Sequence, residues 1–147
     1  MVATFGHILL VDNNRVSNFF NLLALKKFIT VKSIFTNHIL TLDSNEEALN
    51  YINTNKESDS APNTIFINIH STSNEGWEFL EKYNSDYKRC NVDKNIIVLY
   101  KNKLTEEEQN ILSGYTFVSA IANKNLDTNL LEKLEKYVGG ERESIIL

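Results

Sequence analysis

The stretch HILLVD, residues His7–Asp12, decides the fold, because it is a nearly unbroken aliphatic run that ends in a carboxylate. A run of this length without regular polar alternation is typical of a strand that is buried on both faces. Such strands occur mainly in parallel sheets that are covered by helices on both sides. Residues 7–12 therefore predict the first strand of an α/β sheet.

Further strands follow at intervals along the chain. We expect them at Thr64–Ile69, Asn95–Tyr100 and Thr116–Ile121, which are apolar runs of similar length. The second strand is ambiguous, because Val31–Phe35 and His38–Leu42 both have strand character and only one of them need belong to the sheet. We favour His38–Leu42.

Stretches of helical character lie between these runs. The expected helices are Val16–Phe28, a helix that begins with the capping box Ser44–Glu47, Gly76–Tyr87, a short helix from the capping box Thr105–Glu108 to about Leu112, and a last helix capped by Asp127. The five strands and five helices alternate, which predicts a doubly wound parallel sheet of the flavodoxin-like type, with strand order 2-1-3-4-5.

The first helix has an apolar side with a period near 3.6 residues, which we expect to face the core. Its members are Val16, Phe19, Phe20, Leu23 and Phe28. The residues expected on the other side are Asn18, Asn21, Lys26 and Lys27.

One domain is expected over residues 1–138, followed by a C-terminal tail, residues 139–147. The tail begins with a pair of glycines and ends in the apolar tip Ile145–Leu147. We expect it to be flexible. The alternative is that the tip docks on a partner or on a neighbouring copy.

Ligands of doubly wound sheets bind at the carboxyl ends of the strands. The side chains expected to converge there are Asp12 and Asn13 after the first strand, Asn68 late in the third, Tyr100 at the end of the fourth and Lys124 just past the fifth. Position alone therefore predicts a site at this edge.

In this arrangement the chain resembles the receiver domain of bacterial response regulators, from about His7 to Val138. The resemblance rests on ILLVD at Ile8–Asp12, IFINI at Ile65–Ile69, NEGWEFL at Asn74–Leu80, and Lys124 after the fifth strand. It implies a signalling domain of a two-component system, whose chemistry needs an aspartate phosphoacceptor, an acidic pair that holds Mg²⁺, a small hydroxyl residue and a lysine.

Several of these groups are replaced here. Asn68 stands at the phosphoacceptor position, and Asp12 and Asn13 stand at the positions of the acidic pair. Tyr100 replaces the small hydroxyl residue, and Ile121 replaces the aromatic switch residue. At two positions where the family usually has proline, this chain has Thr72 and Asn125. An amide cannot form an aspartyl phosphate, and with Asp12 as the one carboxylate we expect Mg²⁺ binding to be weak or absent. We expect the large Tyr100 ring to fill or cover much of the site.

Structural roles compete with functional ones at these positions. Asp12 and Lys124 are expected to form an ion pair across the pocket. Deamidation of Asn68 could restore a carboxylate, but the bulky Ile69 that follows argues against it. His70 is expected to be a hydrogen-bonded or surface imidazole, since it has no partners at metal-ligand spacing.

Composition narrows the class of protein further. The net charge is -4 with scattered lysines, which argues against a nucleic-acid partner. There is one cysteine and no stretch of about 18 apolar residues, so we expect a cytoplasmic, non-membrane protein.

Three functions remain open. The first is a pseudo-receiver that is not an enzyme and binds a sensor kinase, another regulator or its own copy, through the pocket edge or through the face built by the fourth helix, fifth strand and fifth helix. The second is a phosphorelay receiver phosphorylated at another residue. The third is a nucleotide- or flavin-binding domain, although no glycine-rich loop follows the first strand.

Overall fold

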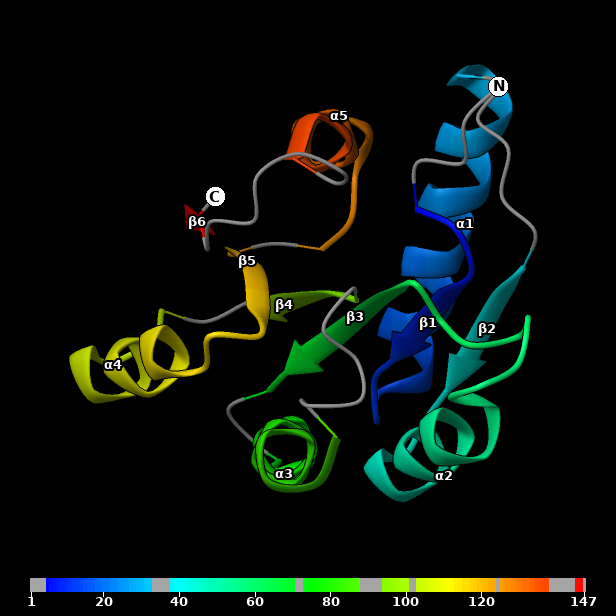
Figure 1. Ribbon diagram of the computed structural model, residues 1–147. Coiled ribbons are helices and arrows are strands. Elements are labelled where there is room, and N and C mark those ends of the chain that lie inside the picture. Colours follow the sequence, from blue (N-terminus) through cyan, green and yellow to red (C-terminus); the bar gives the residue numbers. More distant parts are fainter. Residues whose placement is uncertain are drawn as a thin grey trace.

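Six parallel strands form one sheet in the order β2-β1-β3-β4-β5-β6, with helices on both faces (Figure 1). The structure is a computed structural model that describes residues 5–32, 38–70, 73–87, 94–100, 103–123, 125–137 and 145–146. The strands are β1 Ile8–Val11, β2 Ile39–Leu42, β3 Thr64–Ile69, β4 Asn95–Tyr100, β5 Val118–Ala122 and β6 Ile145–Ile146. The helices are α1 Arg15–Lys32, α2 Asn45–Asn55, α3 Glu75–Lys82, the short π-helix η1 Tyr83–Tyr87 that continues α3, α4 Glu106–Gly114 and α5 Thr128–Tyr137.

The predicted fold class is confirmed for the first five strands, which follow the order 2-1-3-4-5. β3 and β4 have the predicted bounds, and β2 lies in the favoured stretch. The favoured stretch is the one that pairs with β1, and Val31 of the alternative belongs to α1, which runs four residues beyond the predicted end at Phe28; residues 33–35 lie outside the described part. β5 begins two residues later than predicted, because the Val118 N–H donates to the Tyr115 carbonyl at 3.0 Å and residues 116–117 form a turn.

A sixth strand was not predicted. Ile145–Ile146 of the tail pairs in parallel with β5, in register with Ala120 and Ile121. These two tail residues therefore extend the sheet of their own chain, and β5 is not an edge strand. Residues 138–144 and Leu147 lie outside the described part, so the expected flexibility of the tail stays a prediction there.

The sheet separates two apolar clusters. One lies between the sheet and α2, α3 and α4, and includes Leu49, Phe79 and Leu112. The other lies between the sheet and α1 and α5, and includes Phe28 and Leu130. Every residue of β1, β3 and β4 is buried, which explains why these strands read as continuous apolar runs.

The predicted faces of α1 are largely reversed. Four of the five residues expected in the core are exposed: Val16, Phe19, Phe20 and Leu23, with only Phe28 buried. Asn18 and Asn21, which were expected outside, are buried together with Ser17. Lys26 and Lys27 are exposed as predicted.

Polar contacts on the inner side of α1 explain this rotation. The Asn21 Oδ1 atom accepts a hydrogen bond from the backbone N–H of Leu126 at 3.0 Å, and the Asn18 side chain donates to the Leu42 carbonyl at 3.2 Å. Buried backbone groups need such partners. Leu25 and Phe28 complete the inner side as fully buried side chains. The two amides therefore anchor α1 to β2 and to the segment before α5, and the apolar side of the helix is left exposed.

The predicted helix starts are confirmed where polar side chains bind backbone donors. The capping box of α4 is complete, because the Thr105 hydroxyl accepts from Glu108 N and the Glu108 carboxylate accepts from Thr105 N. The Ser44 hydroxyl caps α2, and Asp127 Oδ1 accepts from Leu130 N at 2.7 Å to cap α5. Among the described helices, none is both long and apolar enough to cross a bilayer.

Candidate functional site at the carboxyl ends of the strands

Asp12 lies immediately after β1, and its carboxylate is fully buried. Its Oδ1 atom is engaged twice, by the Nε2 atom of His70 at 2.5 Å and by the backbone N–H of Asn14 at 2.9 Å. The His70 imidazole is 14% exposed and follows β3 directly. The second oxygen, Oδ2, is buried without a hydrogen-bond partner among the described residues. The edge of the sheet therefore carries a buried carboxylate that is paired to an imidazole through one oxygen only.

Asn13 is exposed, and its side-chain amide donates to the Ser73 hydroxyl at 2.8 Å. The same hydroxyl accepts from the backbone N–H of Glu75 at 3.2 Å, at the start of α3. Glu75 in turn accepts from the backbone N–H of Asn45 at 3.3 Å, at the start of α2. A polar network thus connects the end of β1 to the first turns of two helices.

Asn68 is buried near the end of β3, with 4% of its surface exposed. The backbone there touches α3 closely, because a Cβ atom added at Gly76 would lie 2.6 Å from the Asn68 carbonyl oxygen. Gly76, one of the residues that carried the resemblance, therefore allows α3 to pack directly on the strand that bears Asn68. The side chain at this position is a neutral amide, as the sequence states.

Tyr100 and Ile121 both belong to the apolar cluster under α2, α3 and α4, with 9% and 5% exposed. Ile67 and Ile69, the neighbours of Asn68 along β3, belong to that cluster. Because side chains alternate along a strand, the Asn68 side chain projects from the opposite face of the sheet. Tyr100 pairs in register with Ile69, one residue beyond Asn68. The covering of the pocket by the Tyr100 ring stays a prediction.

Lys124 and Thr72 lie outside the described residues, so the predicted ion pair between Asp12 and Lys124 stays untested. Asn125, which follows the lysine, is half-buried, and its Oδ1 atom is buried without a hydrogen-bond partner in the described part of the chain. The partner that the structure does give to Asp12 is His70.

From the sequence, His70 was expected to be only a hydrogen-bonded or surface side chain. The hydrogen-bonded interpretation is confirmed, and the partner is the central carboxylate of the predicted site. A signal was present, since His70 follows a strand whose carboxyl end lies beside that of β1. Spacing along the chain could not supply the pairing, because the two residues are 58 positions apart.

The donor set at this edge fits Mg²⁺ poorly. Mg²⁺ sites in proteins use one or two carboxylates with strict octahedral geometry. Asp12 is the only carboxylate among the five residues predicted to converge at this edge, and one of its oxygens is already bound by His70. Across the described residues, no group of three or more His, Cys, Asp and Glu side chains is placed to hold a metal ion.

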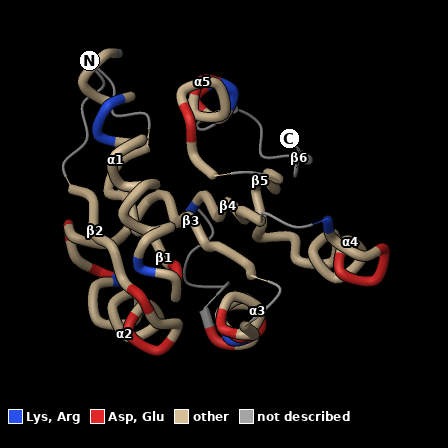
Figure 2. Tube along the Cα trace, turned by 180° about the vertical axis from the view of Figure 1, so that it is seen from behind, with Lys and Arg blue, Asp and Glu red and all other residues tan. Residues whose placement is uncertain are grey.

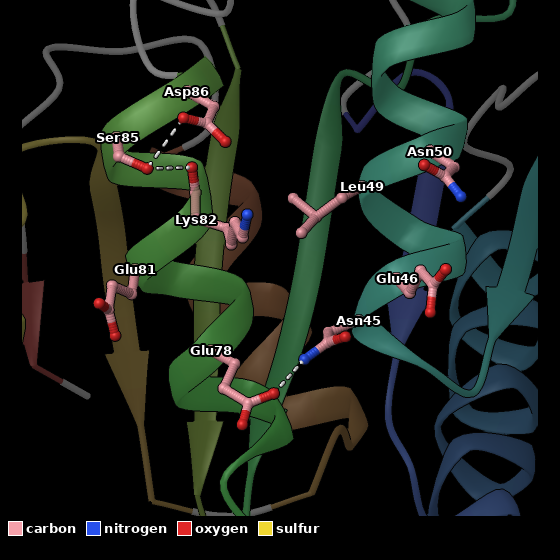
Figure 3. A pocket seen from close by; sticks show the side chains of 9 residues that line it. All are labelled: Asn45, Glu46, Leu49, Asn50, Glu78, Glu81, Lys82, Ser85 and Asp86. Carbon is pink, nitrogen blue, oxygen red and sulfur yellow. Dashed lines mark hydrogen bonds between the residues drawn. The ribbon is translucent and has the colours of Figure 1, made fainter.

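A separate hollow of about 520 Å³ lies between α2 and α3 (Figure 3). Its lining carries four carboxylates and one lysine: Glu46, Glu78, Glu81, Asp86 and Lys82. Asn45, at the end nearest the polar network, donates to the Glu78 carboxylate at 2.9 Å. The hollow is an acidic surface groove that adjoins the predicted site without sharing its side chains.

The fold and the edge site together define a doubly wound α/β domain whose polar residues gather at the carboxyl ends of its strands. Solved structures of receiver domains share this architecture. A two-component response regulator from Cytophaga hutchinsonii matches with a TM-score of 0.75 and 21% identity, over 91% of this chain and 96% of that one. A response regulator receiver protein from Dyadobacter fermentans matches with a TM-score of 0.67 and 17% identity, over 92% and 99%.

The receiver domain of a histidine kinase from Arabidopsis thaliana, solved as a complex with Mg²⁺, matches with a TM-score of 0.61 and 21% identity, over 92% of both chains. No family model and no curated protein sequence matches the chain. At these identities the likeness establishes the fold, which is that of response regulator receiver domains.

Proposed function

We propose that this chain is a receiver-like signalling module that acts by binding other proteins independently of phosphorylation, because the usual phosphoacceptor position cannot accept phosphate. The observation that carries the proposal is Asn68, a buried neutral amide on the strand where receivers place their nucleophile. A carboxamide is a poor nucleophile and gives no acyl phosphate, so the usual transfer has no acceptor at this residue.

The pairing of Asp12 with His70 supports the same proposal. In a working receiver, the acidic pair must be open to a divalent cation before phosphoryl transfer. Here the imidazole lies 2.5 Å from Asp12, and the second position of the pair, Asn13, donates its amide to Ser73. We therefore expect Mg²⁺ binding to be weak or absent.

The partners in this proposal are proteins of a two-component system, such as a sensor kinase or another regulator. The domain would work in the cytoplasm and would not be an enzyme. Its contact surfaces would be the rim of the pocket and the outer helices, because these remain available when the phosphorylation chemistry is absent.

Incubation of the protein with acetyl phosphate and Mg²⁺, followed by intact mass measurement, tests the proposal. We expect no stable gain of a phosphoryl group. A gain that peptide mapping assigns to any residue of the chain would contradict the proposal, and would favour a phosphorelay receiver with a different acceptor.

The variant Asn68→Asp is the matched comparison, because it restores only the nucleophile. A gain of one phosphoryl group by this variant alone would mean that the scaffold retains the rest of the chemistry. No gain by either protein would mean that the loss of phosphorylation also depends on the Asp12 and Asn13 positions. The double variant His70→Ala, Asn68→Asp then measures how much His70 contributes to this loss of phosphorylation.

A further inference from the structure

The outward side of α1 carries an unusual concentration of exposed apolar side chains. We call Val16, Phe19, Phe20, Leu23 and Val31 the α1 stripe; their exposed fractions are 64%, 55%, 59%, 45% and 69%. Among the described residues, the only other large apolar side chain with comparable exposure is Ile111 on α4, at 43%. Single exposed apolar residues are common, but a group of five on one helix marks an interaction surface.

The outward direction of the stripe is built into the fold. Asn18 and Asn21 bind backbone groups of β2 and of the segment before α5, so rotation of α1 to bury the stripe would break both hydrogen bonds. The rings of Phe19 and Phe20 contact each other edge-on at 6.1 Å between centroids. The stripe is thus held in place before any partner arrives.

The size of the stripe suits a reversible dimer. The two phenylalanines, with roughly 150–250 Å² each, leave about 200 Å² exposed between them at their exposed fractions. With the three aliphatic residues, the stripe reaches the range of roughly 300–600 Å² that is often functional on monomers. Two such stripes in contact bury about 1,000 Å² in total, which is near the lower limit for a specific interface.

The spacing of the stripe fits a second copy of the same helix. Val16, Phe20, Leu23, Lys27 and Val31 are separated by four, three, four and four residues and lie along one side of α1. In an antiparallel pair centred between residues 23 and 24, the two Leu23 side chains lie next to each other at the middle. Val16 then lies beside Val31 of the second copy at each end, and Phe20 lies beside its Lys27, whose stem and charge can cover the ring.

Charge argues against an anionic membrane as the occupant. α1 itself carries four basic and no acidic residues (Figure 2), but the chain has a net charge of -4. Asp43 and Glu47 line a hollow of about 320 Å³ directly beside Phe19, and Asp43 is already paired with Arg15 at 2.6 Å. An anionic bilayer that approached the stripe would therefore meet these carboxylates.

We propose that the α1 stripe is the interface of a homodimer, in which α1 helices of two copies pair antiparallel around Leu23. This proposal is independent of the chemistry of the pocket. The contact is isologous, so it closes at two copies. Because the paired helices carry charge of one sign, the dimer is stabilised by added salt.

Sedimentation velocity from roughly 5 to 500 µM, a range that brackets micromolar dissociation constants, tests the proposal. We expect a monomer–dimer equilibrium that shifts toward dimer between low and high salt. Leu23→Asp weakens the dimer at least tenfold, because two carboxylates replace the central contact. Ile111→Asp is the matched control on the α4 face and leaves the dissociation constant unchanged. Circular dichroism melting establishes that both variants are folded.

A monomer at every concentration and salt overturns the proposal. Loss of the dimer in Ile111→Asp with retention in Leu23→Asp also overturns it, and assigns the contact to the α4 face. Binding to vesicles of phosphatidylcholine and phosphatidylserine by a protein that stays monomeric overturns it in favour of a lipid surface. In a Cys90→Ser background, Leu23→Cys should form an intermolecular disulfide on oxidation, whereas Ile111→Cys should not; the reverse pattern contradicts the pairing.

Discussion

α1 and α5 cover the same face of the sheet, yet they differ in whether their apolar side faces it. α5 buries Leu130, Leu131 and Leu134, apolar residues that share one side of the helix. α1 has an equally clear apolar period and exposes most of it. The difference is that α1 carries two asparagines whose side chains bind backbone groups of other elements, and these two hydrogen bonds oppose rotation of the helix toward its apolar period.

The largest expected effect separates the two sides of α1. Leu25 is fully buried and Leu23 is 45% exposed, although both are leucines of one helix. Leu25→Ala should lower the free energy of unfolding by about 2–5 kcal/mol, because it leaves a cavity in the core. Leu23→Ala should change the stability of the monomer by no more than about 0.5 kcal/mol. Urea titrations at low protein concentration measure both; equal losses would refute the reversed orientation.

The anchor itself is tested at Asn21. Asn21→Ala removes the acceptor of the buried Leu126 N–H and should cost about 1–3 kcal/mol. Asn110→Ala, at an exposed position of α4, is the control and should cost at most about 0.5 kcal/mol. If thermal melts gave the two variants the same stability, the Asn21 contact would not explain the rotation of α1.

Both helices also have a side-chain cap, so capping should not distinguish them. Asn14 Oδ1 accepts from Ser17 N at 3.0 Å, and Asp127 Oδ1 accepts from Leu130 N at 2.7 Å. Asn14→Ala and Asp127→Ala should each cost about 1 kcal/mol in denaturant titrations. A loss confined to Asp127→Ala would mean that tertiary contacts alone hold the start of α1.

The smallest effect is expected at the surface ion pair between α1 and the residue after β2. Arg15 and Asp43 are 2.6 Å apart, but the Arg15 side chain is 86% exposed. Arg15→Ala should therefore cost less than about 0.5 kcal/mol, and added salt should remove even that. A larger, salt-independent loss would place Arg15 among the anchors of α1.

Local patterns predicted much of the fold, and their failures have physical reasons. β3 and β4 were located correctly because strands buried on both faces leave long apolar runs. The caps of α2, α4 and α5 were located because capping chemistry acts within four residues. β6 was missed because a two-residue strand has almost no sequence pattern, and its pairing with β5 depends on the path of the chain after α5.

The candidate site divides in the same way. The types of residue predicted at the carboxyl ends of the strands could be identified from the sequence, including the amide at Asn68 and the carboxylate at Asp12. The contact between Asp12 and His70 was not, since it joins the ends of two strands that are neighbours only in the sheet.

The sequence by itself determined the class of fold, the order of the first five strands and the chemical groups present at their carboxyl ends, because these follow from apolar runs and short-range patterns. Only the tertiary structure decided which side of α1 faces the sheet and which group pairs with Asp12. Both depend on hydrogen bonds between residues far apart in the chain, and a buried polar group takes its partner from whatever the fold brings within about 3 Å.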